Sequence, residues 1–227
     1  MSHQFDLEPE FLELYERCRE QTMTSLERMY ALYAATRHIA ERALPGDFVE
    51  CGVWRGGSVM LMALTLLRHG DTTRDLWLYD TFRGMTTPSD CDVQAMSGRA
   101  AADILRDRER TTDDPFWGVA PRAIVEENLR RTGYEHFRFV EGDVTATLPA
   151  SAPEQIALLR LDTDWYASTR HELEHLYPRL VRGGVLIIDD YGYWRGARQA
   201  TDEYLATLQS RPLLHRIDYT GRIAVKP

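Results

Sequence analysis

Apolar runs alternate with segments of helical periodicity along most of the chain. Short apolar runs predict strands at residues 47–53, 76–82, 137–141, 156–161 and 185–188. Apolar positions spaced three and four apart predict helices near residues 24–45, 58–69 and 169–181. Because the strands lack strict alternation, both faces of their sheet are expected to be covered. The pattern predicts a doubly wound α/β fold with a mostly parallel sheet, and residues 213–225 predict an antiparallel hairpin at one edge.

No repeat or Pro/Gly/Ser-rich linker divides the chain, so residues 1–227 predict one domain. Thr24, followed by Glu27, has the form of a capping box and is expected to begin the first helix. Residues 1–45 are then expected to form an N-terminal helical cap. The apolar stretch 59–67 is too short to span a bilayer, which predicts a buried helix instead.

Charge and cysteine content exclude several classes of protein. Lys and Arg number 27 against 35 Asp and Glu, which gives a formal net charge of −8 and disfavours nucleic-acid or anionic-membrane partners. The only lysine is Lys226, so chemistry based on an internal lysine is excluded. Three scattered cysteines and an N-terminus without a signal pattern predict a reduced, cytoplasmic protein.

The turn after the first predicted strand contains the glycines expected of a ligand-binding loop. A phosphate loop needs a lysine that this turn lacks, and Trp54 occupies the middle glycine position of a dinucleotide fingerprint. S-adenosylmethionine carries no phosphate, and its cationic groups favour a carboxylate such as Glu50. Glu50, Gly52, Gly56 and, for the ribose hydroxyls, Asp80 therefore fit S-adenosylmethionine best. An ordinary strand-to-helix bend is the alternative.

The third predicted strand ends at Glu141, and Gly142 and Asp143 follow it. In a doubly wound fold, ligands bind outside the carboxyl ends of the strands. A carboxylate at this end is in a position to meet the adenine amino group. The same residues are equally typical of a simple turn.

Four aspartates follow the next two predicted strands: Asp162, Asp164, Asp189 and Asp190. Carboxylates at this density repel one another unless a cation lies between them. Because all candidate ligands are oxygen atoms, Mg²⁺, Mn²⁺ or Ca²⁺ suits the site better than zinc. Capping of turns and helices by aspartate is the alternative.

The segment from His171 to His175 matches the H-E-x-x-H pattern of zinc metallopeptidases. Leu173 and Leu176 belong to the core-facing stripe of the predicted helix, and both histidines lie far from that stripe around the helix axis. Both histidines are therefore expected to face solvent. A zinc peptidase remains only a remote alternative.

Taken together, these segments resemble the macrocin-type O-methyltransferase (TylF/MycF) family. The resemblance lies in four motifs: DFVECGVWRGGS (47–58), DTFRGM (80–85), LRLDTDWY (159–166) and IDDYG (188–192). Arg83 departs from it, because many members carry an acid there. The resemblance implies a Rossmann-like class I methyltransferase fold and a cofactor site that also includes Ser58, Thr81 and Phe82. It further implies that residues 86–122 form a substrate lid.

Family members methylate deoxysugar hydroxyls of natural products, using S-adenosylmethionine and Mg²⁺. The resemblance therefore implies a small sugar or glycoside acceptor, metal ligation by Asp162, Asp189 and Asp190, and Asp164 as general base. A catechol-type, Mg²⁺-dependent phenol O-methyltransferase is the nearest alternative. That mechanism usually relies on a lysine base and an Asp-Asn metal pair, and this chain has neither. The sequence leaves the acceptor and a homo-oligomeric state open.

Overall fold

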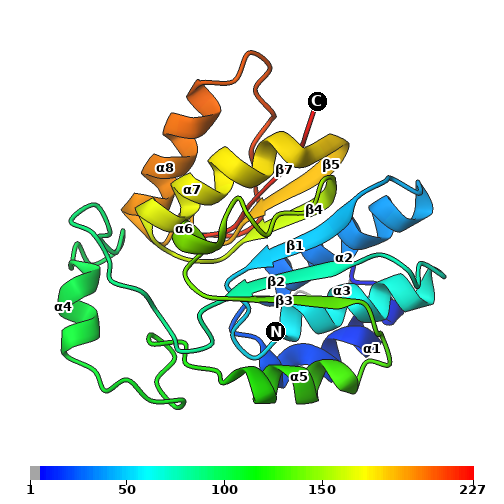
Figure 1. Cartoon of the computed structure of the whole chain (residues 1–227), viewed down its shortest axis with the longest axis horizontal. Helices are drawn as coiled ribbons and strands as arrows, with labels where there is room; N and C mark the ends of the chain where they lie inside the picture. The colour runs from blue at the N-terminus through cyan, green and yellow to red at the C-terminus, as the bar shows by residue number, and fades with distance from the viewer. Residues whose placement is uncertain (1–5) are drawn as a thin grey trace.

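The structure, a computed structural model, describes residues 6–227 and places a seven-stranded sheet at its centre (Figure 1). The strands are β1 (Asp47–Cys51), β2 (Leu76–Asp80), β3 (Phe137–Glu141), β4 (Ile156–Leu161), β5 (Leu180–Ile188), β6 (His215–Arg216) and β7 (Arg222–Val225). Their order is β3-β2-β1-β4-β5-β7-β6. The first five are parallel, and β7 is antiparallel to both β5 and β6. The predicted doubly wound fold and its C-terminal hairpin are confirmed.

Helices cover both faces of the sheet (Figure 1). They are α1 (Pro9–Cys18), α2 (Leu26–Glu41), α3 (Gly57–Arg68), α4 (Ala101–Arg106), α5 (Arg122–Arg130), α6 (Val144–Thr147), α7 (Tyr166–Leu176) and α8 (Arg195–Ala206), with 3-10 turns η1 (Arg19–Gln21) and η2 (Tyr177–Arg179). Helices α1, α2, α3 and α5 share one apolar core with the sheet, and α7 and α8 share another on the opposite face. None of the helices in this part of the chain is both long and apolar enough to cross a membrane.

Alternation along the strands decides which core each side chain joins. In β1, Phe48 belongs to the core under α2 and α3, whereas Val49 and Cys51 belong to the core under α7 and α8. Successive side chains of a strand point to opposite faces of the sheet. Every apolar position in this strand is therefore buried, which explains why its sequence lacks a polar-apolar alternation.

Helices α1, α5 and α8 were not predicted as separate elements. Helix α1 lies within the expected helical cap of residues 1–45, and its face of Phe11, Leu14 and Cys18 is fully buried. Helix α2 begins one residue later than predicted, because Ser25 rather than Thr24 is the N-cap and its side chain accepts a hydrogen bond from Arg28 N. Strand β5 is longer than expected, beginning at Leu180.

Gly52 follows β1 at a point where the backbone passes unusually close to the end of β4. Its φ is +83°, and a Cβ here would lie 2.0 Å from the carbonyl oxygen of Asp162. A hydrogen bond of 2.8 Å from Asp162 N to Cys51 O holds the two segments together. Only glycine fits this position, which fixes the first turn against the strand that carries Asp162.

We expect Gly52→Ala to lower the free energy of unfolding by about 2–5 kcal/mol, because it combines a left-handed backbone with overpacking. Gly70→Ala is the matched control, since Gly70 has φ +74° but a Cβ added there would meet no atom within 4 Å. The control should lose only the backbone cost, about 1–2 kcal/mol. Urea unfolding measures both, and equal losses in the two variants would contradict the close approach.

Candidate active site

A cavity of about 330 Å³ opens at the carboxyl ends of the parallel strands. All five strand ends contribute to it, as expected for a doubly wound fold. Seven carboxylate side chains line it (Glu50, Asp80, Asp143, Asp162, Asp164, Asp189 and Asp190), together with a single basic residue, Arg28. Such a lining favours cationic ligands.

Asp80, at the end of β2, holds the glycine turn in place. Its carboxylate accepts hydrogen bonds from the backbone N–H groups of Val53 at 2.7 Å and Trp54 at 3.1 Å, and Phe82 N donates to its other oxygen at 2.7 Å. Trp54 itself has φ +47°. Asp80 therefore shapes the turn directly, as well as lining the cavity where a ribose is expected.

Most of the predicted cofactor residues line this cavity: Glu50, Gly52, Ser58, Asp80, Thr81, Gly142 and Asp143. Gly56 and Phe82 are not among its lining residues. Gly56 is the N-cap of α3, where its φ of +88° needs glycine and a Cβ would meet Val125. Phe82 is buried in the core against Phe139, at 6.0 Å between ring centroids.

Asp143 has a structural task as well. It is the N-cap of the short helix α6, and its Oδ1 accepts from Thr145 N at 2.9 Å and Thr145 Oγ1 at 2.7 Å. The structure therefore shows at Asp143 the simple turn that the sequence also allowed. Gly142 reaches φ +140°, which lets β3 end directly beside the cavity.

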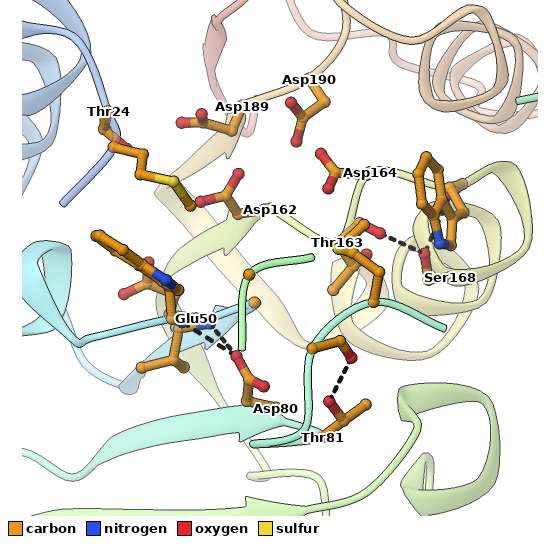
Figure 2. A pocket seen from close by; sticks show the side chains of 18 of the residues that line it. Thr24, Glu50, Asp80, Thr81, Asp162, Thr163, Asp164, Ser168, Asp189 and Asp190 are labelled. Carbon is orange, nitrogen blue, oxygen red and sulfur yellow. Dashed lines mark hydrogen bonds between the residues drawn. The ribbon is translucent and has the colours of Figure 1, made fainter. Parts of the chain in front are cut away.

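Three of the four aspartates converge. One carboxylate oxygen each of Asp162, Asp164 and Asp190 lies within 4.8 Å of the others, and this is the only such group of potential metal ligands in residues 6–227. Like charges this close repel one another unless protons or a cation offset them. Figure 2 shows the carboxylates of Asp164 and Asp190 next to one another.

Enclosure of these carboxylates changes their acidity. Burial raises the pKa of Asp164 to about 7 and that of Asp162 to about 6, and neighbouring carboxylates add to both shifts. Burial also raises the pKa of Asp190, which is further raised by Asp164 and Asp189. A group of acids that resists ionisation in this way has a high affinity for a cation that neutralises it.

Asp189 turns away from this group, toward Thr24 (Figure 2). Its carboxylate accepts from Arg160 Nη2 at 2.6 Å and is also paired with Arg28 Nη1. Asp189 and Asp190 directly follow β5, and their side chains point in different directions (Figure 2). The expected ligand set of Asp162, Asp189 and Asp190 thus differs from the cluster that the structure brings together.

Arg160 is a buried cation behind the cavity that sequence reasoning missed. It is 1% exposed and is the next-to-last residue of β4. Its guanidinium is paired with Glu50, lies 2.8 Å from Asp162 Oδ2, and donates to Thr24 Oγ1 at 2.9 Å. An arginine inside the apolar run of residues 157–161 was the available signal. Burial raises the pKa of Glu50 to about 8 despite this arginine.

We expect Arg160→Met to cost about 3–5 kcal/mol of unfolding free energy, because it leaves several buried carboxylates without their cation. Arg68→Met is a suitable control, since Arg68 pairs with Glu13 on the surface. That exposed pair is worth at most about 1 kcal/mol. Chemical denaturation of both variants tests this, and a small loss at Arg160 would mean that protonation of Glu50 and its neighbours replaces the guanidinium.

The H-E-x-x-H segment does not gather a third metal ligand in the described residues. Both histidines are half-buried rather than in free solvent, which corrects the expectation, and His171 Nε2 lies 3.3 Å from the carbonyl oxygen of Leu148. Lys226 is equally remote from the cavity. Its ammonium donates to the carbonyl groups of Tyr177, Pro178 and Leu180.

Residues 86–122 form one wall of the cavity through Thr86, Ile104, Leu105, Pro115, Phe116 and Gly118. The segment is tied to the beginning of α7, where Tyr166 N donates to Asp92 Oδ1 at 2.7 Å. It is also tied to the beginning of α8 by a backbone bond of 2.9 Å from Arg195 N to Val93 O. Between these anchors and residue 122, α4 projects from the body of the molecule (Figure 1).

The fold and this acid-lined cavity define the class: a Rossmann-like methyltransferase. The NovP O-methyltransferase structure matches with a TM-score of 0.77 and 30% sequence identity, covering 91% of this chain and 82% of that one. The calicheamicin methyltransferase CalS11 matches with a TM-score of 0.65 at 20% identity, over 96% of this chain and 93% of that one, which shows the shared fold.

The family follows from sequence comparison. The model of the macrocin-O-methyltransferase (TylF) family matches residues 18–225. A tetracenomycin-C rhamnosyl 4'-O-methyltransferase of Streptomyces olivaceus is 37% identical over 203 residues, 88% of this chain and 73% of that protein. Mycinamicin III 3''-O-methyltransferase of Micromonospora griseorubida is 33% identical over 81% of this chain and 69% of its own length. The chain belongs to the TylF family and is an S-adenosylmethionine-dependent O-methyltransferase.

Proposed function

We propose that this enzyme transfers a methyl group from S-adenosylmethionine to a hydroxyl of a sugar carried by a natural product, with a divalent cation at the aspartate cluster. The observation that carries the proposal is the convergence of Asp162, Asp164 and Asp190 beside the cavity. The named relatives that act on rhamnosyl and mycinamicin substrates support the choice of a sugar hydroxyl.

The cofactor would lie along the ends of β1, β2 and β3. Glu50 is buried, and its Oε2 has no hydrogen-bond partner among the described residues, so it is available for the ammonium group. Asp80 and Thr81 line the part of the cavity beside the turn, where the ribose would lie. Gly142 and Asp143, at the end of β3, would meet the adenine.

The aspartate cluster has the donor set of a hard divalent cation such as Mg²⁺, Mn²⁺ or Ca²⁺. The unsatisfied Oδ2 of Asp190 lies in this cluster. We propose Asp162 and Asp190 as ligands, and Asp189 as a third ligand only if its carboxylate leaves Arg160 and Arg28. When bound, the cation would act as a Lewis acid that stabilises the developing alkoxide.

Asp164 is proposed as the general base. It would take the proton of the acceptor hydroxyl as the new O–CH₃ bond forms and the S–CH₃ bond breaks, leaving S-adenosylhomocysteine. Trp194 lines the same cavity, and its indole N–H would help to orient this carboxylate. The turn that carries Asp164 holds it at the cavity surface in a left-handed conformation, with φ +68°.

Aromatic side chains support a sugar as the acceptor. Trp165, Trp194 and Tyr193 line the cavity next to the aspartates, and the rings of Trp165 and Trp194 pack edge to face at 4.9 Å. Flat aromatic faces suit the apolar face of a pyranose. Arg28 is occupied by Asp189 and Asp218, which leaves no free cation among the lining residues for an anionic acceptor. We propose that residues 86–122 close over this acceptor.

The test is methyl transfer from labelled S-adenosylmethionine to a neutral rhamnoside bearing an apolar aglycone, with Mg²⁺ or with EDTA. A simple catechol serves as the competing acceptor. We expect methylation of the sugar only, and only with the cation present. Equal or faster methylation of the catechol would replace the sugar by a phenol, and full turnover in EDTA would remove the cation from the proposal.

A further inference from the structure

Glu172 is a buried carboxyl group that the proposed mechanism does not use. It is the glutamate of the H-E-x-x-H segment, lies in α7, and is 0% exposed. A buried carboxyl destabilises a fold unless its hydrogen bonds compensate for the lost water. Its contacts therefore indicate why this position carries an acid.

The one hydrogen bond of this carboxyl reaches the aspartate turn. Glu172 Oε1 accepts from Thr163 Oγ1 at 2.9 Å, whereas Oε2 has no partner in the part of the chain that the structure describes. Burial, with a smaller contribution from the carboxylates of Asp162 and Asp143, raises the pKa of Glu172 to about 8. The side chain is thus mainly protonated and uncharged at neutral pH.

Thr163 lies between two members of the cluster, Asp162 and Asp164. Its carbonyl accepts from Trp165 N at 2.8 Å and from Ser168 Oγ at 3.2 Å, and Figure 2 shows Thr163 and Ser168 side by side. Asp164 has φ +68°, a conformation that costs a residue other than glycine about 1–2 kcal/mol. The turn therefore depends on contacts with α7 to keep this shape.

We propose that Glu172 is a positioning residue whose hydrogen bond to Thr163 holds the turn that sets Asp162 and Asp164 against Asp190. The role does not require the glutamate to be charged or to touch substrate. Its effect on turnover rests on the proposed function, whereas its effect on the turn does not.

Three variants test this inference. Thr163→Val and Glu172→Ala each remove the hydrogen bond, and we expect each to lower turnover and Mn²⁺ affinity about 10- to 100-fold, the usual range for a residue that supports a metal site from behind. Glu172→Gln keeps the acceptor oxygen and the shape of a protonated glutamate, so it should stay within about threefold of the wild type. Because both substitutions remove the same hydrogen bond, the double variant should lose no more turnover or Mn²⁺ affinity than the more strongly affected single variant.

Thr201→Val is the matched control, since Thr201 is also 0% exposed and donates to the carbonyl of Ala197 in α8. It should lose stability without losing Mn²⁺ affinity. Crystal structures of Thr163→Val and Glu172→Ala provide a readout without turnover, and we expect Asp164 to leave its left-handed conformation. If the wild type transfers no methyl group, the proposed function fails. Mn²⁺ affinity and the position of Asp164 then still test whether Glu172 positions the turn. An unmoved Asp164 with Mn²⁺ affinity within twofold of the wild type would overturn the inference.

Discussion

Asp164→Asn is expected to lower turnover by about 10²–10⁴-fold, the usual contribution of a general base. Asparagine keeps the size of the side chain and tolerates the left-handed conformation that Asp164 adopts, so the turn should keep its shape. The amide cannot accept the proton of the acceptor hydroxyl. Affinity for S-adenosylmethionine, measured by calorimetry, should stay unchanged because the proposed cofactor site lies at other strand ends.

The pH dependence gives a second readout of the same residue. The pKa of Asp164 is raised to about 7, and a bound cation would lower it. A base must be deprotonated, so kcat/KM should rise with pH and reach its plateau at or below about pH 8. This rise of kcat/KM with pH should disappear in Asp164→Asn. Asp202→Asn, an exposed substitution in α8, is the control and should leave both rate and profile unchanged.

Mn²⁺ affinity separates the two roles open to Asp164. A base can be replaced without changing cation binding, whereas a ligand cannot. If Asp164→Asn binds Mn²⁺ as tightly as the wild type and turns over slowly, Asp164 acts as the base. If its Mn²⁺ affinity falls with its turnover, the three converging carboxylates all bind the cation and the base must be sought elsewhere in the cavity.

The sequence predicts the strands of this fold well because each apolar run is bounded by turn residues. The limits of β3 and β4 agree with the predicted ones. Helix α1 lies within the expected helical cap but was not delimited, because its N-cap Glu8 makes no side-chain capping bond that would mark where it begins. The cap of α2 was misplaced by one residue because Thr24 and Ser25 are equally good caps, and Thr24 instead accepts a bond from Arg160.

The position of the aspartates was predictable, but their partners were not. Strand order and the β4–β5 register bring the two strand ends together, which follows from the pattern. The direction of each side chain depends on the backbone that follows β5, where Asp189 pairs with Arg160 and Asp190 lies in the cluster with Asp164. Arg160 reaches Glu50 on a neighbouring strand, and such a pairing between distant residues leaves no local signature in one sequence.

The same physical reason explains the mixed result for the cofactor residues. Gly56 and Phe82 lie within motifs whose neighbours line the cavity, yet one caps a helix and the other packs into the core. A motif locates a turn, but the backbone conformation decides which of its residues faces the ligand. Both have positive φ values, so the backbone at each position departs from the extended conformation of the preceding strand.

We expect Asp190→Asn to be more stable than the wild type without metal and less stable than the wild type with bound Mg²⁺. Burial and the neighbouring acids raise the pKa of Asp190, so the folded protein holds this proton more tightly than the unfolded chain. Stability from this group is present below the unfolded pKa of about 3.9 and is lost as pH rises toward the folded pKa. Asparagine cannot ionise, so the variant does not lose this stability as pH rises. Without metal, Asp190→Asn should therefore melt at a higher temperature than the wild type. The difference in melting temperature should be larger at pH 8 than at pH 5.

With saturating Mg²⁺ the order should invert, because only the wild type gains the free energy of cation binding, about 2.7 kcal/mol at a hundred times the Kd. Turnover of the variant should fall at least about 100-fold, since the loss of the cation withdraws several kcal/mol of alkoxide stabilisation. Thermal unfolding of both proteins in EDTA and in Mg²⁺ measures this change in the order of their melting temperatures. A wild type that gains no stability from Mg²⁺ at pH 8 would show that shared protons, rather than a cation, hold these three carboxylates together.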